Sequence, residues 1–382
     1  MLTDMMKDEL VKGLLNLFHE NLSMIILYGS VARNEATSES DIDIAIITKN
    51  DMNEEIETLN FDNENNFNFQ VINQYGEDLT QKTYITNPAI AREEEIKKLI
   101  MVLLTPEKSG LLVGKPGIGK TAIVEGLAYL IQKNQVPDAL KGYKIIKLSS
   151  TSLVGKITRN GQEELIIQIL VNELKHMTKT IVFIDEIHTL IGGKSDGPMD
   201  LANILKPGLD RGDIKAIGAT TTIEYDAYII RDRAFLRRFE KIDVREPDEE
   251  TTVKILMGSL PKIEKQTGCK MKYNEYVTHQ LMESIVSATT EFKRVYGLSA
   301  MYPDIAFSVL TAAFSQALFK NKNQVDVTDV YNAIKTSKRI YPDSIVKELQ
   351  LFREKFVKLC NEEGVVLPIV TIDDVKNEDD IY

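Results

Sequence analysis

A short glycine-rich stretch has the residue types and the spacing needed to bind phosphate groups. It consists of Gly114, Lys115, Pro116, Gly117, Ile118, Gly119, Lys120 and Thr121. Glycines let backbone N–H groups approach a phosphate because no Cβ atom stands in the way. In loops of this pattern the lysine contacts the β- and γ-phosphates, and the hydroxyl that follows it binds Mg²⁺. The stretch therefore predicts a nucleoside triphosphate site in which Lys120 supplies the positive charge and Thr121 binds the metal.

Two acidic residues stand where they would complete such a site. They are Asp185 and Glu186, and they follow the run Ile181 to Ile184, which has the length and composition of a buried strand. We expect Asp185 to bind Mg²⁺ and Glu186 to polarise the attacking water, so the predicted cofactors are ATP and Mg²⁺. His188 follows closely, and we interpret it as a packing or supporting residue rather than a ligand.

A second pair of carboxylates occurs near the beginning of the chain. One apolar run ends at Gly29 and Ser30, and the next begins with Asp41 and Asp43. Residues i and i+2 of a strand lie on the same face, so these two carboxylates lie on the same side of the predicted strand. A third strand is predicted from Phe67 to Ile72. These elements predict a small α/β unit in front of the glycine-rich stretch.

The elements around the phosphate loop alternate between helices and strands. Helices and strands are predicted, in chain order, at 93–104, 110–113, 121–133, 145–148, 165–176, 181–184 and 216–219. This alternation is typical of a parallel sheet with helices on both faces. Past Pro247 the strand pattern fades, and residues 250–337 have the pattern of several helices. We therefore predict an α/β fold in which a P-loop sheet is followed by a helical lid.

Composition limits the classes of partner and compartment. The formal net charge of −11 provides no global attraction to nucleic acid or to an anionic membrane, although a local basic patch is compatible with it. Cys269 and Cys360 are the only cysteines and lie far apart, which argues against a disulfide framework and against a zinc site. The sequence has no apolar run of the length of a membrane span and no signal-peptide pattern. We therefore expect a cytoplasmic protein.

Seven stretches, taken in order, resemble the first ATPase module of Clp/ClpB-type AAA+ chaperones. They are Tyr75–Thr80, Ala91–Ile96, Gly119–Ala128, Phe183–Leu190, Lys194–Gly197, Gly218–Thr221 and Leu236–Phe239. The resemblance covers residues 75 to about 310. It implies an ATP-hydrolysing AAA+ domain that carries a helical lid.

This resemblance also implies roles for single residues. Ile90 and Ala91 fall in the segment whose backbone meets the adenine, and Thr221 matches the residue that reads the γ-phosphate. Arg237 and Arg238 match the arginine fingers, which complete the ATP site of a neighbouring subunit. Such an arrangement implies a ring or spiral of identical subunits, typically a hexamer, that acts on a protein partner.

One departure from that family concerns the loop that contacts the substrate. Clp proteins have a Lys-Tyr-Arg-Gly loop in their central pore, and its tyrosine grips the threaded polypeptide. Alignment on Gly161 puts Arg159 where this tyrosine would be. A guanidinium group favours acidic or phosphate-bearing partners and lacks the apolar grip of an aromatic ring. We therefore predict that the protein does not pull polypeptides through a pore; in the alternative, Ile157 supplies the grip.

The front residues resemble the minimal nucleotidyltransferase signature of the polymerase-β-like superfamily. In that family the Gly-Ser turn, here Gly29 and Ser30, binds the triphosphate, and two carboxylates, here Asp41 and Asp43, bind Mg²⁺. Active members have a third carboxylate on a later strand, where this sequence offers Gln70. A neutral amide adds no negative charge to a metal site, so the resemblance leaves open whether this domain is active or only binds.

These observations predict four segments and leave three interpretations. The segments are a nucleotidyltransferase-like domain at 1–74, a large P-loop ATPase subdomain at 75–246, a helical lid at 247–340 and a C-terminal extension at 341–382. In the first interpretation an oligomeric ATPase remodels, recruits or senses a macromolecule, with the front domain as adaptor. In the second, an active nucleotidyltransferase modifies protein or RNA under control of the ATPase; in the third, ATP only assembles a scaffold. Glu186 argues against the third interpretation and Gln70 against the second.

Overall fold

The computed structural model describes two units of the chain, residues 1–65 and 66–382. Within them it describes residues 22–28, 43–48, 70–153, 155–159, 162–191, 215–295, 301–340, 342–372 and 374. In the first unit, strands β1 (Leu22–Tyr28) and β2 (Asp43–Thr48) pair antiparallel, which confirms the two predicted strands. Their register places Tyr28 opposite Asp43.

Six strands form the central sheet of the second unit. They are β3 (Gly76–Asp78), β4 (Ser109–Val113), β5 (Lys144–Ser149), β8 (Thr180–Asp185), β9 (Lys215–Thr220) and β10 (Phe239–Asp243). Their order is β10-β4-β9-β8-β5-β3, and every neighbouring pair is parallel except β5 with β3. The predicted parallel sheet is therefore confirmed. Ligands of such sheets bind beyond the carboxyl ends of the strands, where the phosphate loop follows β4 and where β8 ends at Asp185.

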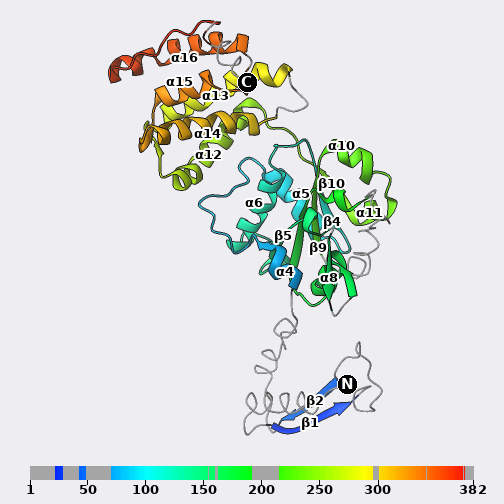
Figure 1. Cartoon of the computed structure of the whole chain (residues 1–382). Helices are drawn as coiled ribbons and strands as arrows, with labels where there is room; N and C mark the ends of the chain where they lie inside the picture. Colours follow the sequence, from blue (N-terminus) through cyan, green and yellow to red (C-terminus); the bar gives the residue numbers. More distant parts are fainter. Residues whose placement is uncertain are drawn as a thin grey trace. The chain divides into compact units, whose positions relative to one another are not determined.

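Helices cover both faces of this sheet (Figure 1). They are α5 (Glu93–Leu104) and α6 (Lys120–Gln132) on one face, and α8 (Ile166–Leu174) and α11 (Arg233–Arg238) on the other. Successive residues of a strand point to opposite faces, so in β8 Ile181 and Phe183 pack with α5 and α6, and Val182 and Ile184 pack with α8. All four side chains are buried, which makes β8 a central strand and fixes the position of Asp185 at its end.

The predicted third strand of the front domain is wrong where the structure describes it. Gln70 begins a helix, α4 (Gln70–Tyr75), and Val71 and Ile72 are buried in the core that contains α8. The N–H groups of Val71 and Ile72 donate to the two oxygens of the buried Glu173 carboxylate, at 2.8 and 2.9 Å. A carboxylate at the first turn satisfies N–H groups that have no partner within the helix. This long-range cap favours a helix, and Gln70 therefore does not occupy a strand of the front unit.

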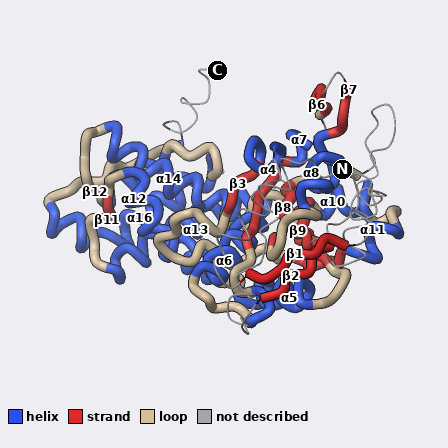
Figure 2. The backbone as a smooth tube through the Cα atoms, turned by 90° about the horizontal axis from the view of Figure 1, so that it is seen from below, coloured by secondary structure: helices blue, strands red, loops and turns tan. Residues whose placement is uncertain are grey.

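Five helices form the lid. They are α12 (Glu249–Thr267), α13 (Glu275–Val295), α14 (Asp304–Phe319), α15 (Val327–Lys335) and α16 (Pro342–Glu363), joined by the short parallel pair β11 (Lys270–Met271) and β12 (Gln324–Val325). Figure 2 shows them gathered together beside the sheet. One hydrophobic cluster contains residues of all five helices, including Ile345, Leu349, Phe352 and Phe356 of α16. The segment predicted as a C-terminal extension thus shares its core with the helices that precede it.

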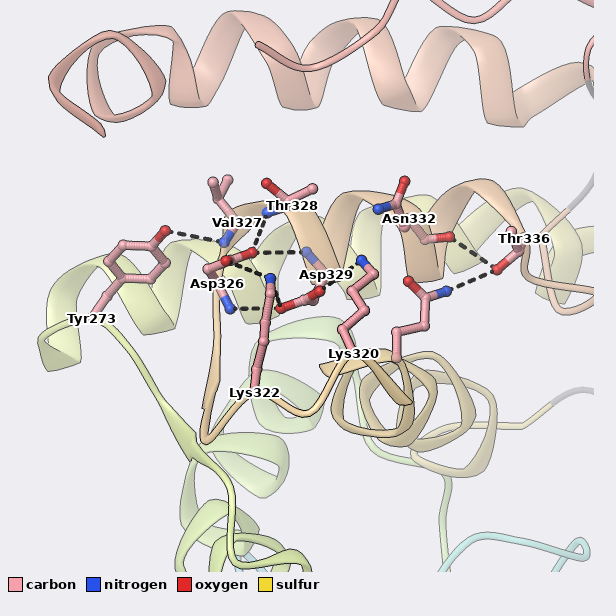
Figure 3. Close-up of polar contacts among 10 residues, drawn as sticks. Tyr273, Lys320, Lys322, Asp326, Val327, Thr328, Asp329, Asn332 and Thr336 are labelled. Carbon is pink, nitrogen blue, oxygen red and sulfur yellow. Dashed lines mark hydrogen bonds and ion pairs between the residues drawn. The ribbon is translucent and has the colours of Figure 1, made fainter. Parts of the chain in front are cut away.

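A polar network at the beginning of α15 holds the lid helices together (Figure 3). The Asp326 carboxylate accepts hydrogen bonds from the N–H groups of Thr328 and Asp329, and the fully buried Asp329 side chain pairs with Lys322 at 2.9 Å. Tyr273 accepts from the Val327 N–H and donates to the Glu363 carboxylate in the last turn of α16. These bonds tie the first turn of α15 to two other parts of the lid.

Short elements complete the second unit. They are η3 (Asp138–Leu140), α7 (Ser150–Leu153), β6 (Lys156–Arg159), β7 (Gln162–Leu165), η4 (Ile187–Leu190), α10 (Thr222–Glu224) and the π-helical turn η5 (Tyr225–Ile229). Strands β6 and β7 form an antiparallel hairpin that projects from the rest of this unit (Figure 2). No helix in the described ranges is both long enough and apolar enough to cross a membrane.

Candidate nucleotide-binding site

The predicted phosphate loop connects the end of β4 with the first turn of α6. Gly117 and Gly119 have φ angles of 73° and 95°, a left-handed conformation that residues with a Cβ rarely adopt. A Cβ atom on Gly117 would also lie 2.8 Å from the Cβ of Asp304 in the lid. Because the glycines permit this tight path, the backbone N–H groups and the beginning of α6 form a cradle for an anion.

Lys120 donates hydrogen bonds within this loop. Its Nζ lies 2.8 Å from the carbonyl oxygen of Gly114 and 3.0 Å from that of Lys115. Burial lowers the pKa of Lys120 below its usual value. Carboxylates nearby act in the opposite direction, and they belong to Asp185, Glu224 and Glu186. An added triphosphate would favour the charged ammonium group further.

Thr121 and Asp185 meet at the metal position expected from the sequence. The Thr121 hydroxyl donates to Oδ2 of Asp185 at 3.2 Å. One hydroxyl and one carboxylate suit Mg²⁺, which keeps several waters and binds through one or two carboxylates together with the phosphates of a substrate. No group of three His, Cys, Asp or Glu residues could hold a metal ion in the part of the chain that the structure describes. The donors therefore fit a magnesium ion that is bound together with a nucleotide.

Glu186 directly follows β8 and has an unusual backbone. Its φ angle is 52°, and its N–H donates to Oδ1 of Asp185 at 3.1 Å. Its carbonyl oxygen accepts from the N–H and the hydroxyl of Thr189, at 3.0 and 3.1 Å. A residue with a Cβ is uncommon in this region of φ and is often found at functional sites. The Glu186 side chain is exposed and lines the cavity described next.

A cavity of about 830 Å³ lies between the sheet subdomain and the lid. Its polar end is formed by the loop residues 116–121 with Asp185 and Glu186, and Ile90, Ile255 and Phe307 give its other walls an apolar character. Gly258 of α12 permits close packing, since a Cβ there would lie 2.7 Å from Cδ1 of Ile90. Ala91, with a φ angle of 55°, follows Ile90 but does not line the cavity. An apolar region beside a phosphate cradle suits a nucleotide base and its triphosphate.

Thr221 lies at the end of β9 and lines the same cavity. Its hydroxyl oxygen accepts from the N–H of Glu224 at 3.3 Å, and its own N–H donates to Oε2 of Glu224 at 3.0 Å. Glu224 also lines the cavity, and sequence reasoning missed it. Burial raises the pKa of Glu224, but hydrogen bonds from Thr221 and the proximity of His188 outweigh burial, and the pKa lies below its usual value.

Arg92 is a second residue that sequence reasoning missed as part of the site. Its buried guanidinium donates to the carbonyl oxygens of Ile118 in the phosphate loop and of Arg245 after β10, at 2.7 and 2.8 Å. It also pairs with Glu95 at 3.0 Å. These bonds connect the phosphate loop with the segment after β10 and so stabilise the conformation of the loop. The arginine stood in a stretch that carried the family resemblance, but its partners are distant in the sequence.

The predicted arginine fingers lie at the end of α11. Arg237 is exposed, and Nη1 of Arg238 donates to the carbonyl oxygen of Ala234 at 2.9 Å. Neither arginine lines the cavity of its own chain. This placement differs from that of Lys120, Thr121 and Asp185, which the fold brings together within one chain.

The remaining predicted residues fall largely outside the described part of the chain. Gly29, Ser30 and Asp41 lie outside it, and Asp43 is placed only as the first residue of β2. Arg159 is the last residue of β6, and the structure gives its backbone alone. The geometry of the second predicted metal site therefore remains a prediction.

Two family models match the chain. Residues 110–244 match the ATPase family associated with various cellular activities (AAA). Residues 12–100 match the nucleotidyltransferase family of polymerase beta. The two matches agree with the order of the two predicted nucleotide-site motifs along the chain.

Similar proteins and structures extend the likeness beyond the P-loop. Chaperone protein ClpB of Pseudomonas putida is 36% identical over 265 residues, 68% of this chain and 30% of the relative. ClpB of Bacteroides thetaiotaomicron is 38% identical over 251 residues, 64% of this chain and 28% of the relative. The chain thus spans less than a third of these relatives.

Solved structures of Hsp104 are also similar. The Saccharomyces cerevisiae Hsp104:casein complex in its extended conformation has a TM-score of 0.56 and 34% identity, and the match covers 68% of this chain and 44% of that one. The closed state of Hsp104 with ATPγS and FITC casein has a TM-score of 0.61 and 30% identity, covering 81% and 52%.

Proposed function

We propose that this chain, which carries a Clp-type AAA+ module behind a polymerase-β-type nucleotidyltransferase domain, hydrolyses ATP as an oligomer and thereby remodels, recruits or senses a macromolecular partner. One observation carries the proposal. The phosphate loop, the Thr121–Asp185 pair and the exposed Glu186 carboxylate line a single cavity that is closed on one side by the lid. This arrangement suits the transfer of a γ-phosphoryl group to water.

Each residue of the cavity has a distinct part in this reaction. Lys120 exchanges its bonds to the carbonyls of Gly114 and Lys115 for bonds to phosphate oxygens, so its positive charge is already located where the phosphates bind. Thr121 and Asp185 would hold Mg²⁺, which neutralises charge on the phosphates. Glu186 orients a water for attack on the γ-phosphorus and accepts its proton.

Oligomerisation is supported by two features of the surface beside α11. Arg237 and Arg238 stand apart from the cavity of their own chain, as groups that serve a neighbouring site must. Three apolar side chains in the segment before α11 are exposed. They are Ile223 of α10 at 75%, and Tyr228 of η5 and Ile230 directly after η5 at 49% each. Apolar side chains grouped on a surface are typical of a contact with another subunit. We propose a ring or spiral of identical subunits, with six subunits as in the Clp-type assemblies that the chain resembles.

The partner is proposed to be a protein that binds without being threaded. ClpB and Hsp104 are the relatives, and two of the Hsp104 structures contain casein. In this chain the segment aligned with the Clp pore loop is the β6–β7 hairpin, and Lys156 pairs with Glu163 across it at 2.9 Å. A hairpin of polar residues with Arg159 at its end suits an acidic or phosphate-bearing partner better than an arbitrary chain.

We propose the front domain as an adaptor, with nucleotidyl transfer as the second candidate. The match to the polymerase-beta family over residues 12–100 favours the second candidate, since it includes both predicted carboxylates, Asp41 and Asp43. However, Gln70 begins α4 of the second unit, so the expected strand position offers no third metal ligand there. A scaffold without hydrolysis is disfavoured by the presence of Glu186 beside the phosphate loop.

Labelled ATP separates these candidates in one experiment. With ATP labelled on the γ-phosphate and on the α-phosphate in parallel, hydrolysis releases label as free phosphate, whereas nucleotidyl transfer puts α-label on protein or RNA. We expect free phosphate from the wild type, and at least 100-fold less from Glu186→Gln with ATP binding retained, since a general base contributes about 10²–10⁴ in rate. Lys120→Ala should bind no ATP. Normal turnover by Glu186→Gln would contradict the assignment of the base.

A further inference from the structure

One carboxylate oxygen of Glu224 connects the segment that carries Glu186 with the segment that carries Thr221. Oε2 accepts hydrogen bonds from the Thr221 N–H at 3.0 Å and from the Thr220 hydroxyl at 3.3 Å, and it lies 3.1 Å from Nδ1 of His188. Thr220 is the last residue of β9 and Thr221 directly follows it, whereas His188 belongs to η4, directly after Asp185 and Glu186. Glu224 therefore bridges the end of β8 and the end of β9.

The bridge extends to Glu186 through the backbone of η4. The Glu186 carbonyl oxygen accepts from the N–H of Thr189, the residue next to His188. The His188 ring also stacks on Tyr228 of η5, with 6.1 Å between ring centroids and 18° between the planes. His188 is therefore held on one side by Glu224 and on the other by Tyr228. A polar contact and a ring contact therefore both act on His188, the second residue of η4.

The chemistry of these groups determines which atoms donate and which accept within the bridge. Nδ1 of His188 lies 3.2 Å from the Thr220 hydroxyl oxygen and 3.1 Å from Oε2 of Glu224, so a ring proton on Nδ1 has an acceptor at both positions. The ionised Glu224 accepts from the Thr221 N–H and the Thr220 hydroxyl at this one oxygen, and charge-assisted bonds of this kind are stronger than neutral ones. The Glu224 N–H in turn donates to the Thr221 hydroxyl at 3.3 Å, which fixes that side chain at the wall of the cavity.

We propose that Glu224 and His188 are positioning residues for ATP hydrolysis, which hold Thr221 and Glu186 in a fixed relative position across the γ-phosphate. The inference rests on the proposed hydrolysis of ATP. Neither residue touches the reacting atoms in this account; each acts through the backbone or side chain of a residue that does. The bridge thus couples the reading of the γ-phosphate at Thr221 to the activation of water at Glu186.

Two isosteric replacements of His188 test which ring nitrogen matters. The side-chain amide of asparagine stands close to the place of Nδ1, and that of glutamine close to the place of Nε2. We expect His188→Asn to keep most of the turnover because it still donates to Glu224. His188→Gln should lower kcat roughly 10–100-fold, the usual effect of removing a residue that orients a catalytic ligand. KM for ATP should change little in both variants, since the phosphate loop is untouched.

Glu224→Gln is the complementary change. It should lower kcat to a similar extent, and the double variant with His188→Gln should be no slower than the slower single variant, because both changes break the same bridge. His279→Gln is the matched control, since His279 forms a comparable pair with Glu283 on the exposed surface of α13, at 3.4 Å. Its kcat should equal that of the wild type.

The measurements are steady-state phosphate release, binding of a fluorescent ATP analogue and thermal unfolding of each variant. Absence of hydrolysis by the wild type would overturn the proposed function and this inference together. If the wild type hydrolyses ATP, equal kcat values for His188→Asn and His188→Gln would overturn the inference alone. A fully additive double variant would do the same. If Glu224→Gln fails to fold, the comparison of the two His188 variants still decides.

Discussion

The ATP cavity and the β6–β7 hairpin belong to the same unit but are specified in different ways. The cavity joins Thr121, Asp185, Thr221 and the lid, which are far apart in the sequence. The hairpin is formed by ten consecutive residues, 156–165, and Lys156 and Glu163 make an exposed ion pair across it. Pairs of this kind contribute about 0–1 kcal/mol. The cavity therefore joins distant parts of the fold, whereas the hairpin pairs residues that are close in the sequence and packs Ile157 and Leu165 against the core that contains α8.

In the function proposed above, this difference separates the site of ATP hydrolysis from the proposed contact with a partner. Residues of the cavity have several partners each, as the bonds of Lys120 and Glu224 show, so few replacements are tolerated there. The hairpin projects from the sheet subdomain (Figure 2), and its exposed Lys156 and Glu163 side chains take no part in those bonds. A Clp-type ATPase can in this way keep its nucleotide chemistry while its partner changes.

The largest effect is expected at the proposed arginine fingers, which would complete the cavity of a second subunit. Replacing both Arg237 and Arg238 by Ala should lower ATP turnover by about 10³–10⁵, the usual contribution of an arginine finger. Binding of ATP should persist because neither arginine lines the cavity of its own chain. Phosphate release and analytical ultracentrifugation of the ATP-loaded variant measure the two properties separately.

Mixing variants tests whether the site is shared. The double arginine variant has an intact phosphate loop, and Lys120→Ala has intact arginines, so a mixed interface can combine both intact halves. We expect the mixture to recover part of the turnover that each variant lacks alone. Normal hydrolysis by the double arginine variant would show that the site is not shared between subunits.

A smaller and more selective effect is expected in the hairpin. The wild type should hydrolyse ATP but fail to unfold a substrate protein that carries a fluorescent tag and an unstructured tail. The reason is that Arg159 has no aromatic ring with which to grip an arbitrary chain. Arg159→Tyr should begin to unfold the substrate, with ATP turnover close to that of the wild type. Loss of tag fluorescence with ATP is the measurement, and Arg159→Lys is the control that keeps the charge. Robust unfolding by the wild type that is lost in Ile157→Ala would restore the threading interpretation.

The sequence predicts best those parts of the molecule in which neighbouring residues determine the structure. Helix α5 was expected at 93–104 and is found there, since its apolar residues recur with helical spacing and three glutamates occupy its first turn. The hairpin was missed, although Asn160 and Gly161 between its strands are a common two-residue turn sequence. These strands were not predicted because most of their residues are polar and lack the apolar run of a buried strand.

The parts that the sequence could not predict depend on distant partners. The sequence of α4 has the pattern of a strand, but the carboxylate of Glu173, about a hundred residues away, caps the first turn of a helix there. Arg92 was not identified because its acceptors, the carbonyl oxygens of Ile118 and Arg245, are distant in the sequence. Glu224 was missed for another reason, since its capping box with Thr221 is a local pattern that indicates a helix start and not a nucleotide site. The motif residues were predictable because fixed chemistry demands fixed residue types; the residues that support them make diverse contacts and have no such signature.

The smallest expected effect concerns backbone strain next to Ile90, a residue that lines the cavity. Ala91 has a φ angle of 55°, a left-handed conformation that costs a residue with a Cβ about 1–2 kcal/mol. Ala91→Gly removes this cost but adds freedom to the unfolded chain, worth about 0.4–1 kcal/mol in the opposite direction. We therefore expect a net stabilisation of roughly 0.5–1 kcal/mol. Thermal unfolding of the nucleotide-free protein should show a higher midpoint.

The neighbouring Ala89 provides a control of opposite sign. Ala89 is buried, its φ angle is not positive, and its Cβ packs so closely on α6 that a Cβ added at Gly126 would lie 2.2 Å from it. Ala89→Gly should therefore lower the midpoint, because it loses this packing and gains only chain freedom. The hairpin contains no such left-handed residue among those that the structure describes. A lower midpoint for Ala91→Gly would mean that the Ala91 methyl group stabilises the adenine segment by more than its backbone conformation costs.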